Sequence, residues 1–212
     1  APELAQLARA AAPGALVVGF AEESAGHLFY NSALLAEDGE LRHVHRKVHL
    51  PTYGLFEEQR YFAAGRRLQA FPSAKLGRVG LLVCEDFWHV SSAAVLQADG
   101  VDLLICIANS PARGVDGPRI RTAETYERLS RTFAELLGCV VVVCHRVGFE
   151  DGLCFYGGSL VVGPDGELLA QAPAFEECLQ TVEIDLAELR RARTITPLAR
   201  DTLKAFGITL EE

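Results

Sequence analysis

Apolar residues gather in short continuous runs separated by turn signals, a pattern typical of buried β-strands. Four such runs cover residues 15–20, 77–83, 101–108 and 139–145. Two more, 28–36 and 40–48, flank Glu37-Asp38-Gly39, a turn of the kind that joins hairpin strands. Towards the end of the chain we expect strands at 158–162, 168–172 and 178–184, with a turn at Pro164-Asp165-Gly166 between the first two. The pattern therefore predicts extensive sheet.

Amphipathic stretches alternate with these runs and predict helices. They cover residues 3–12, 90–98, 119–137 and 186–193, and Gly138 is a natural stop for the third. Residues 51–67 instead carry aromatics without clean periodicity, which indicates a structured loop with a short helical piece. Strands and crossover helices in alternation, with no linker or repeat, predict one α/β domain over residues 1–212 with helices outside the sheets.

Composition supports an ordinary globular protein. Half of the 212 residues are hydrophobic and 23% are charged, which excludes disorder, collagen and coiled coil. The net charge of −8 and the lack of a long basic run argue against nucleic acid or an anionic membrane as partner. No stretch approaches the roughly 18 to 20 apolar residues of a membrane span, and residues 1–20 do not read as a signal peptide. We expect a cytoplasmic protein whose six cysteines are reduced and mostly buried.

Cys84 has the most suggestive position. It ends the apolar run 77–83 and is followed at once by Glu85-Asp86-Phe87-Trp88 and a helix. Such a strand-to-helix elbow displays a thiol at the sheet edge, with the backbone N–H groups of Glu85 and Asp86 near enough to lower its pKa or to bind an oxyanion. The alternative is a small residue filling the core, the commoner fate of a cysteine. The elbow favours a functional thiol.

Lys47 lies in an alternating stretch that places His43, His45, Lys47 and His49 on one strand face. A lysine held beside a thiol and a carboxylate stabilises an oxyanion and depresses the pKa of the thiol. On an outward face it is only solvated charge, and the residues alone favour that alternative. The basic side chains on and around this face disfavour a metal site built from the histidines.

Glu57 and Glu58 lie within the aromatic-rich segment 53–62. A carboxylate among aromatics can be a poised acid or base. Equally, both can be acidic residues at a helix N-terminus, where the helix macrodipole favours them. The pattern leaves these two interpretations open.

Longer motifs carry a resemblance. The pattern Arg46-Lys47-x-x-Leu50-Pro51-x-Tyr53-Gly54-x-Phe56-x-Glu58-x-x-Tyr61-Phe62, followed by Cys84-Glu85-Asp86 at the end of its strand, resembles the nitrilase or carbon–nitrogen hydrolase superfamily. The similarity is greatest to the glutaminase part of glutamine-dependent NAD synthetases and to stand-alone amidohydrolases. Further matches are Phe29-Tyr30-Asn31-Ser32, Asn109-Ser110-Pro111 and Phe155-x-Gly157-Gly158-Ser159.

The resemblance implies an α/β fold, the αββα four-layer sandwich, and a Glu-Lys-Cys triad. Cys84 would attack the carbon of a small amide or nitrile, and Lys47 with the N–H group of Glu85 would hold the oxyanion. Glu58 matches a supporting glutamate near the lysine. It further implies a pocket that includes Tyr53 and Asn109, no metal or organic cofactor, and a two-fold homodimer or larger assembly. Trp88 and His89 are candidates for the pocket as well, with a buried aromatic that packs against the sheet as the equal alternative.

The triad glutamate has no match in this chain. In the family it lies in a P-E-x-x-x-x-G-Y context some 60 to 70 residues before the lysine, whereas Glu3 precedes Lys47 by 44 residues and no Gly-Tyr follows. We therefore expect the native protein to carry an N-terminal extension with the first strand and that glutamate, in line with the absence of any methionine. The alternative is an inactive remnant.

The leading hypothesis is an enzyme that hydrolyses a non-peptide carbon–nitrogen bond of a small amide through a cysteine thioester. Trp88-His89 stands where most amidases of the superfamily carry Pro-Glu, and we expect no synthetase domain after Asp201. A detached glutaminase subunit that supplies ammonia to a synthetase, or a nitrilase, is the alternative among enzymes. A catalytically incomplete scaffold or binding protein is the non-enzymatic alternative.

Overall fold

A computed structural model describes residues 2–205 of the chain. The expected single domain over 1–212 thus includes residue 1 and residues 206–212, which lie outside the described part. The strands are β1 (Ala15–Glu23), β2 (Phe29–Glu37), β3 (Glu40–Arg46), β4 (Ala70–Ser73), β5 (Gly77–Val83), β6 (Leu103–Ala108), β7 (Val115–Asp116), β8 (Arg119–Ile120), β9 (Val140–His145), β10 (Val147–Glu150), β11 (Leu153–Tyr156), β12 (Leu160–Val162) and β13 (Leu168–Gln171). The helices are α1 (Pro2–Ala10), α2 (Val90–Ala98), α3 (Arg121–Leu137), α4 (Ala187–Ile195) and α5 (Leu198–Ala205), with short 3-10 helices η1 (Glu58–Arg60) and η2 (Cys84–Trp88).

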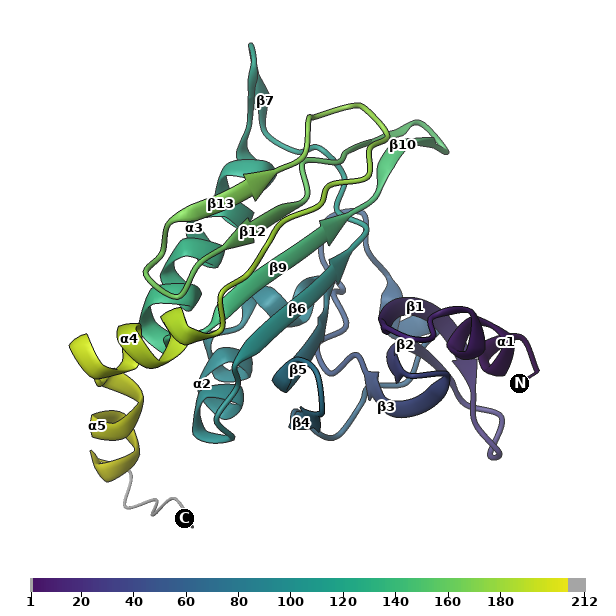
Figure 1. Cartoon of the computed structure of the whole chain (residues 1–212). Coiled ribbons are helices and arrows are strands. Elements are labelled where there is room, and N and C mark those ends of the chain that lie inside the picture. Colours follow the sequence, from purple (N-terminus) through teal and green to yellow (C-terminus); the bar gives the residue numbers. More distant parts are fainter. Residues whose placement is uncertain (1, 206–212) are drawn as a thin grey trace.

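The first part of the chain forms an antiparallel three-stranded sheet in the order β1-β2-β3. Successive side chains of a strand point to opposite faces, so β2 contacts a different layer of the molecule on each face. Leu34 and Ala36 pack with Ala8 of α1, whereas Ala33 and Leu35 pack against strand β5. All four β2 residues are fully buried. Helix α1 lies on the outer face of this sheet (Figure 1).

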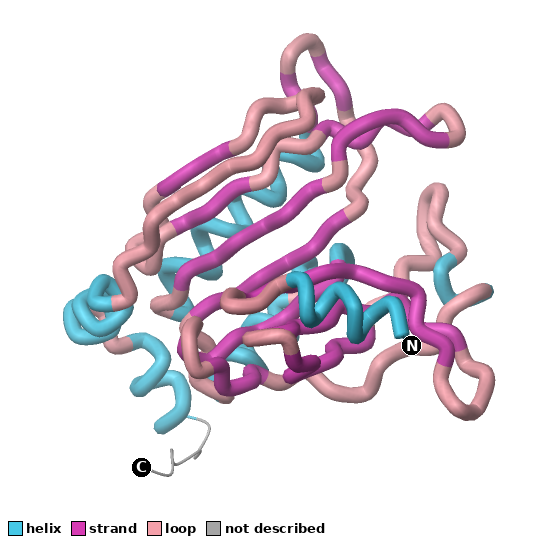
Figure 2. Tube along the Cα trace, turned by 45° about the vertical axis from the view of Figure 1, so that its right-hand side comes forward, coloured by secondary structure: helices cyan, strands magenta, loops and turns pink. Residues whose placement is uncertain are grey.

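The second sheet has six strands in the order β13-β12-β9-β6-β5-β4. Its centre, β5-β6-β9, is parallel, and the strands at both edges run antiparallel to their neighbours. Parallel neighbours require crossover connections, which α2 and α3 supply. Both helices cover the same face of the sheet (Figure 2).

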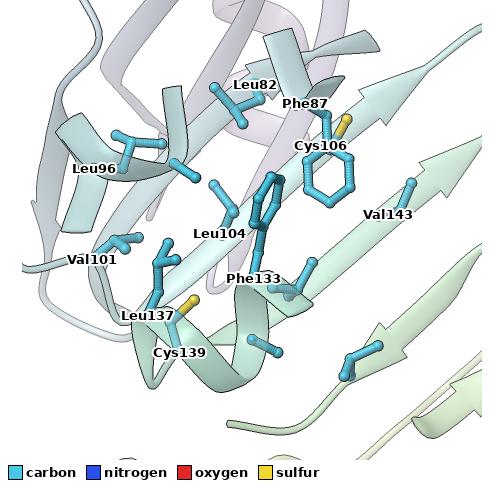
Figure 3. Close-up of a cluster of buried hydrophobic side chains, with 14 of the residues drawn as sticks. Leu82, Phe87, Leu96, Val101, Leu104, Cys106, Phe133, Leu137, Cys139 and Val143 are labelled. Atoms are coloured by element: carbon cyan, nitrogen blue, oxygen red, sulfur yellow. The ribbon is translucent and has the colours of Figure 1, made fainter. Parts of the chain in front are cut away.

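The main core lies between this sheet and these helices. Leu104 from β6 meets Phe133 and Leu137 from α3, and Leu96 contributes from α2 (Figure 3). Helix α3 ends as the sequence predicts, because Gly138 adopts a left-handed conformation with φ 58° and donates its N–H to Ala134.

The two sheets pack face to face, with α1 outside one and α2 and α3 outside the other. Ala33 and Leu35 form the contact with Val79, Leu81 and Val83 of β5. The order of layers is thus helix, sheet, sheet, helix. The expected αββα sandwich is confirmed.

Several local expectations are wrong. Residues 178–184 form no strand, although Val182 and Ile184 pack against the six-stranded sheet as extended chain. Strands β4, β7, β10 and β11 and helix α5 lie where no regular element was expected, and β8 takes the first two residues of the helix expected at 119–137. None of the described helices is both long and apolar enough to cross a bilayer.

The cysteines also differ from expectation. All six are free, but only Cys106 and Cys139 are buried, whereas Cys144 and Cys178 are exposed and Cys84 is half-buried. The prediction of mostly buried thiols is therefore wrong. The apolar run 139–145 does not reveal that Cys144 lies on the less covered face of β9.

Candidate active site

The site lies where three parallel strands end. Cys84 follows β5, Asn109 follows β6, and His145 is the last residue of β9. The carboxyl ends of neighbouring parallel strands meet at one sheet edge, where ligands of α/β proteins commonly bind. A cavity of about 680 Å³ opens there, and Lys47 and Glu58 line it together with these three residues.

Cys84 has a backbone that side-chain sterics disfavour. Its φ is 48°, in the left-handed region, and η2 begins at this residue. Strained residues of this kind cluster at functional sites, where the surrounding structure holds them in place. The turn brings the sulfur to the cavity. The predicted elbow is thus present.

The resting thiol does not have the depressed pKa that the elbow led us to expect. Burial raises the pKa of Cys84, and it outweighs the lowering effects of Lys47, of the Tyr126 hydroxyl and of the backbone N–H of Asn109. The Tyr126 hydroxyl lies 3.6 Å from the sulfur. The thiol is therefore the resting form at neutral pH, and the groups that would stabilise a thiolate already surround it.

Lys47 points inward, so the solvated alternative is wrong. Its side chain is only 3% exposed, and its ammonium group pairs with a carboxylate oxygen of Glu58. The other oxygen of Glu58 accepts a hydrogen bond of 2.7 Å from the side-chain amide of Asn31. Glu58 also begins helix η1, as the second interpretation expects, and its role as an acid or base stays a prediction, whereas Glu57 is exposed and pairs with Arg60.

Asp86 links the two motifs that carry the resemblance. One carboxylate oxygen accepts the backbone N–H groups of Val48 and His49 at 3.0 and 2.8 Å. The other accepts the N–H of Val83 at 3.2 Å and lies 2.8 Å from Nε2 of His45. Asp86 is fully buried. The sequence includes Asp86 in the motif but does not reveal that it ties the Lys47 segment to the cysteine elbow.

Of the predicted pocket residues, Glu85, Trp88 and Asn109 line the cavity. Tyr53 and His89 are not among the residues that line it, and their part in the pocket stays a prediction. Both contact Glu85 instead: the Tyr53 hydroxyl is 2.9 Å from each carboxylate oxygen, and Nε2 of His89 is 3.6 Å from one of them. Burial, followed by the bond to Glu85, raises the pKa of Tyr53. His89 stacks on His49 with ring centroids 3.7 Å apart.

An aromatic wall that the sequence did not predict supports the sulfur. Trp88 and His145 each meet Tyr126 edge to face, at 5.5 and 4.4 Å between ring centroids. Nε2 of His145 lies 3.2 Å from the Tyr156 hydroxyl, and its Nδ1 is buried without a hydrogen-bond partner. Burial lowers the pKa of His145 to about 4, so this imidazole is neutral at pH 7. The only signal in the sequence is that His145 ends an apolar run.

Two further cavity residues, Arg113 and Phe56, come from loops and were also missed as site residues. As for metals, no group of three or more His, Cys, Asp or Glu within residues 2–205 is arranged to hold an ion. His43, for example, stacks on Phe71 rather than joining the other histidines. The site's chemistry is that of a thiol, an ammonium group and carboxylates.

Comparison with known proteins places this geometry in a family. The model of the family described as carbon-nitrogen hydrolase matches residues 1–194. The chain belongs to the carbon–nitrogen hydrolase family. The resemblance seen in the motifs is thereby confirmed.

Relatives of this carbon–nitrogen hydrolase include much longer proteins. A glutamine-dependent NAD(+) synthetase of Thermotoga maritima is 36% identical over 173 residues, which are 81% of this chain and 29% of that protein. The chain spans about a third of the length of such curated relatives.

Solved structures confirm the fold. A carbon-nitrogen hydrolase from Helicobacter pylori G27 has a TM-score of 0.85 at 30% identity, over 93% of this chain and 71% of that one. A mutant amidase from Nesterenkonia sp. AN1 has a TM-score of 0.74 at 26% identity, over 94% of this chain and 71% of that one. In that amidase the acetamide moiety of fluoroacetamide is covalently added to the active-site cysteine.

Proposed function

We propose that this carbon–nitrogen hydrolase cleaves the C–N bond of a small amide through a thioester on Cys84, releasing ammonia or an amine. The observation that carries the proposal is that Cys84, on its left-handed elbow, lines one cavity with the Lys47–Glu58 pair. A nucleophile, a fixed positive charge and free backbone N–H groups are what acyl transfer requires.

The reaction follows from these positions. After the thiol loses its proton, the sulfur attacks the amide carbon, and the carbonyl oxygen becomes an oxyanion held by the Lys47 ammonium and the Glu85 N–H. The C–N bond then breaks, and the nitrogen leaves as ammonia or an amine after it gains a proton equivalent to the one that the thiol lost. Water attacks the thioester, releasing a carboxylic acid and the thiol.

Each supporting group has a distinct task. Glu58 fixes the position of the Lys47 ammonium group through their ion pair, and Asn31 in turn orients Glu58. Tyr126 and the N–H of Asn109 face the sulfur and favour its anionic form. We assign no residue as the proton acceptor, because Glu3 is exposed on α1 and lies outside the cavity wall.

A second candidate is a glutaminase that supplies ammonia to a synthetase. The similarity to one third of proteins described as glutamine-dependent NAD(+) synthetases favours it. The two candidates share the chemistry at Cys84 and differ in the fate of the ammonia.

The test is to incubate the protein with a panel of small amides that includes glutamine and asparagine. Ammonia release is measured, and intact and peptide-mapped mass locates any acyl adduct. We expect turnover and an adduct of the acyl mass on Cys84, both absent in Cys84→Ala. Turnover that persists in Cys84→Ala, or an adduct on Cys144 instead, would contradict the thioester mechanism.

A further inference from the structure

A second cavity, of about 730 Å³, lies beside β3, the strand at one edge of the three-stranded sheet. Its wall consists of residues 43–46 of β3, Glu22 and Tyr30 of the neighbouring strands, and residues of the segment 64–69 that leads to β4. None of the described residues that line it also lines the cavity at Cys84. Its volume is in the range of sites for small organic ligands, roughly 300 to 1,000 Å³. The second cavity is therefore large enough to be a binding site of its own.

The segment 64–69 is held at both ends. The N–H of Gly65 donates to the carbonyl of Lys47 at 2.7 Å, and the two backbones lie so close that a Cβ added to Gly65 would be 2.0 Å from the preceding carbonyl oxygen of β3. Just beyond the other end, the N–H of Ala70 donates to the Asp99 carboxylate at 2.7 Å. The two arginines of this segment are thus carried by an anchored backbone.

The cavity wall has an excess of positive charge. The guanidinium of Arg46 holds Glu22 with two hydrogen bonds and lies 4.1 Å from the centre of the Tyr30 ring. Glu22 is the one acidic residue among the described residues of the wall. Arg66 and Arg67 are exposed, and no ion pair or hydrogen bond joins their side chains to another residue of the described chain. Two positive charges therefore face this cavity without a partner, in a chain whose net charge is −8.

The two histidines of the wall have other partners. His43 stacks on Phe71 with ring centroids 5.1 Å apart, and burial, followed by the proximity of His45, lowers the pKa of His43. His45 lies 2.8 Å from the carboxylate of Asp86. Recognition of an anion would thus depend on the guanidinium groups of the wall.

We propose that this second cavity binds the phosphate group of a phosphorylated small molecule through Arg66 and Arg67. Guanidinium groups pair with phosphate oxygens through parallel hydrogen bonds, and a phosphate group with a charge of about −1.5 to −2 at pH 7 compensates two arginines. The volume leaves room for an organic part beside the phosphate. The inference goes beyond the proposed function and is independent of it, because the cavity is separate from that of Cys84.

The test uses inorganic pyrophosphate as the probe, because it presents phosphate groups without an organic part. Isothermal titration calorimetry at low salt measures its dissociation constant, and sodium sulfate at the same ionic strength is the reference anion. We expect saturable binding of pyrophosphate, at least tenfold tighter than that of sulfate, which is the size of one further charge-assisted hydrogen bond.

Matched double variants assign the binding to the cavity. Arg66→Gln with Arg67→Gln should weaken the binding of pyrophosphate at least tenfold, because both guanidinium groups are lost. Arg190→Gln with Arg191→Gln makes the same change in net charge at exposed positions of α4, outside the cavity wall. This control should bind pyrophosphate as the wild-type protein does.

Chemical modification locates the anion in the wild-type protein. Phenylglyoxal labels arginines, and peptide-mapped mass follows each site. Pyrophosphate should slow the labelling of Arg66 and Arg67 and leave that of Arg190 and Arg191 unchanged.

Three results would overturn the proposal. Pyrophosphate that binds no tighter than sulfate would mean that the two arginines are only solvated surface charge. An equal loss of affinity in both double variants, or unchanged labelling of Arg66 and Arg67 in a protein that binds pyrophosphate, would place the anion elsewhere on the surface. All of these measurements report binding rather than turnover, so their outcome does not depend on the proposed function.

Discussion

At the scale of single residues, the surroundings of Cys84 have opposing effects on the pKa of its thiol. Burial favours the neutral thiol, whereas Lys47, Tyr126 and the N–H of Asn109 favour the thiolate. Such a balance leaves the thiol protonated at rest and makes its pKa sensitive to each neighbour. The Tyr126 hydroxyl is the neighbour that can be removed with the least disturbance, because its ring also packs on Phe87 at 5.8 Å between centroids.

Replacing Tyr126 by Phe should raise the pKa of Cys84. The substitution deletes a hydrogen bond to the sulfur and keeps the ring, so the thiolate loses about 1 kcal/mol of stabilisation, or somewhat less than tenfold in alkylation rate at a fixed pH. The measurement is the pH dependence of iodoacetamide labelling at Cys84, read by mapped mass. In Tyr156→Phe, whose hydroxyl contacts His145, the midpoint should stay close to that of the wild-type protein. An unchanged midpoint in Tyr126→Phe, or an equal shift in both variants, would contradict the assignment.

The sequence predicted part of this residue-level arrangement. Cys84, Lys47 and Glu58 stand out because they lie in long motifs with characteristic spacing. Tyr126 does not, because its approach to Cys84 depends on β5, β6 and β9 being neighbours, and strand order is not encoded in local periodicity.

The elements of the site are held together by one carboxylate. Asp86, in η2, binds the segment just after β3 through Val48 and His49. Lys47 lies within that segment, so the distance between the ammonium group and the thiol depends on this link. The two motifs, 37 residues apart in the sequence, therefore act as one unit.

Asp86→Asn should weaken that unit. An amide of the same size places a donor where buried N–H groups need an acceptor and removes the charge opposite His45, so the free energy of unfolding should fall by about 3 kcal/mol. Urea denaturation followed by circular dichroism measures it. Asp116→Asn makes the same chemical change at an exposed position of β7 and should alter stability by less than about 0.5 kcal/mol.

Labelling of Cys84 gives a second readout for this substitution. Displacement of Lys47 should slow alkylation in folded Asp86→Asn, because the thiolate loses a nearby positive charge. Retained stability together with an unchanged labelling rate would show that Asp86 does not position the two motifs.

At the scale of elements, hydrophobic periodicity predicts a helix or strand best where one face of the element is buried. It predicts least where packing between elements decides the local conformation. Helix α3, which buries one face, follows its pattern closely. Residues 178–184 have the apolar residues of a strand, but Val182 and Ile184 pack on the face of a sheet rather than pairing along its edge. Nothing in the local pattern distinguishes these two ways of burying the same side chains.

The whole molecule places the site where the two sheets meet. Asn31 and Lys47 come from the three-stranded side, whereas Cys84 and His145 come from the six-stranded side. Any loss of packing between the layers therefore separates the charged pair from the thiol. The αββα order could be expected from the resemblance, but this division of the site between the layers could not.

Acid should destabilise the whole fold through His145. Burial, with Tyr126 and Tyr156 around the ring, holds the pKa of this residue near 4, whereas an unfolded chain has it near 6.5. As pH falls from the unfolded pKa towards the folded pKa, the unfolded state binds a proton at this residue and the folded state does not. The free energy of unfolding therefore decreases. Between pH 7 and pH 4.5 this one group should remove about 2 kcal/mol.

His145→Gln tests this contribution, because glutamine can still bond the Tyr156 hydroxyl but does not titrate. Urea titrations at pH 7 and pH 4.5 give the decrease in the free energy of unfolding for each protein. That decrease should be smaller in His145→Gln than in the wild-type protein by about 2 kcal/mol. His27→Gln, at a side chain that is 86% exposed, should leave the wild-type loss unchanged. The carboxylates whose pKa is lowered, such as Glu22, lose their own stabilisation over the acid range in all three proteins and cancel in the comparison. If His145→Gln lost as much stability between pH 7 and pH 4.5 as the wild-type protein, the imidazole would be charged in the folded state at pH 4.5. That result would contradict the assignment of His145 as a neutral residue of the aromatic wall beside Cys84.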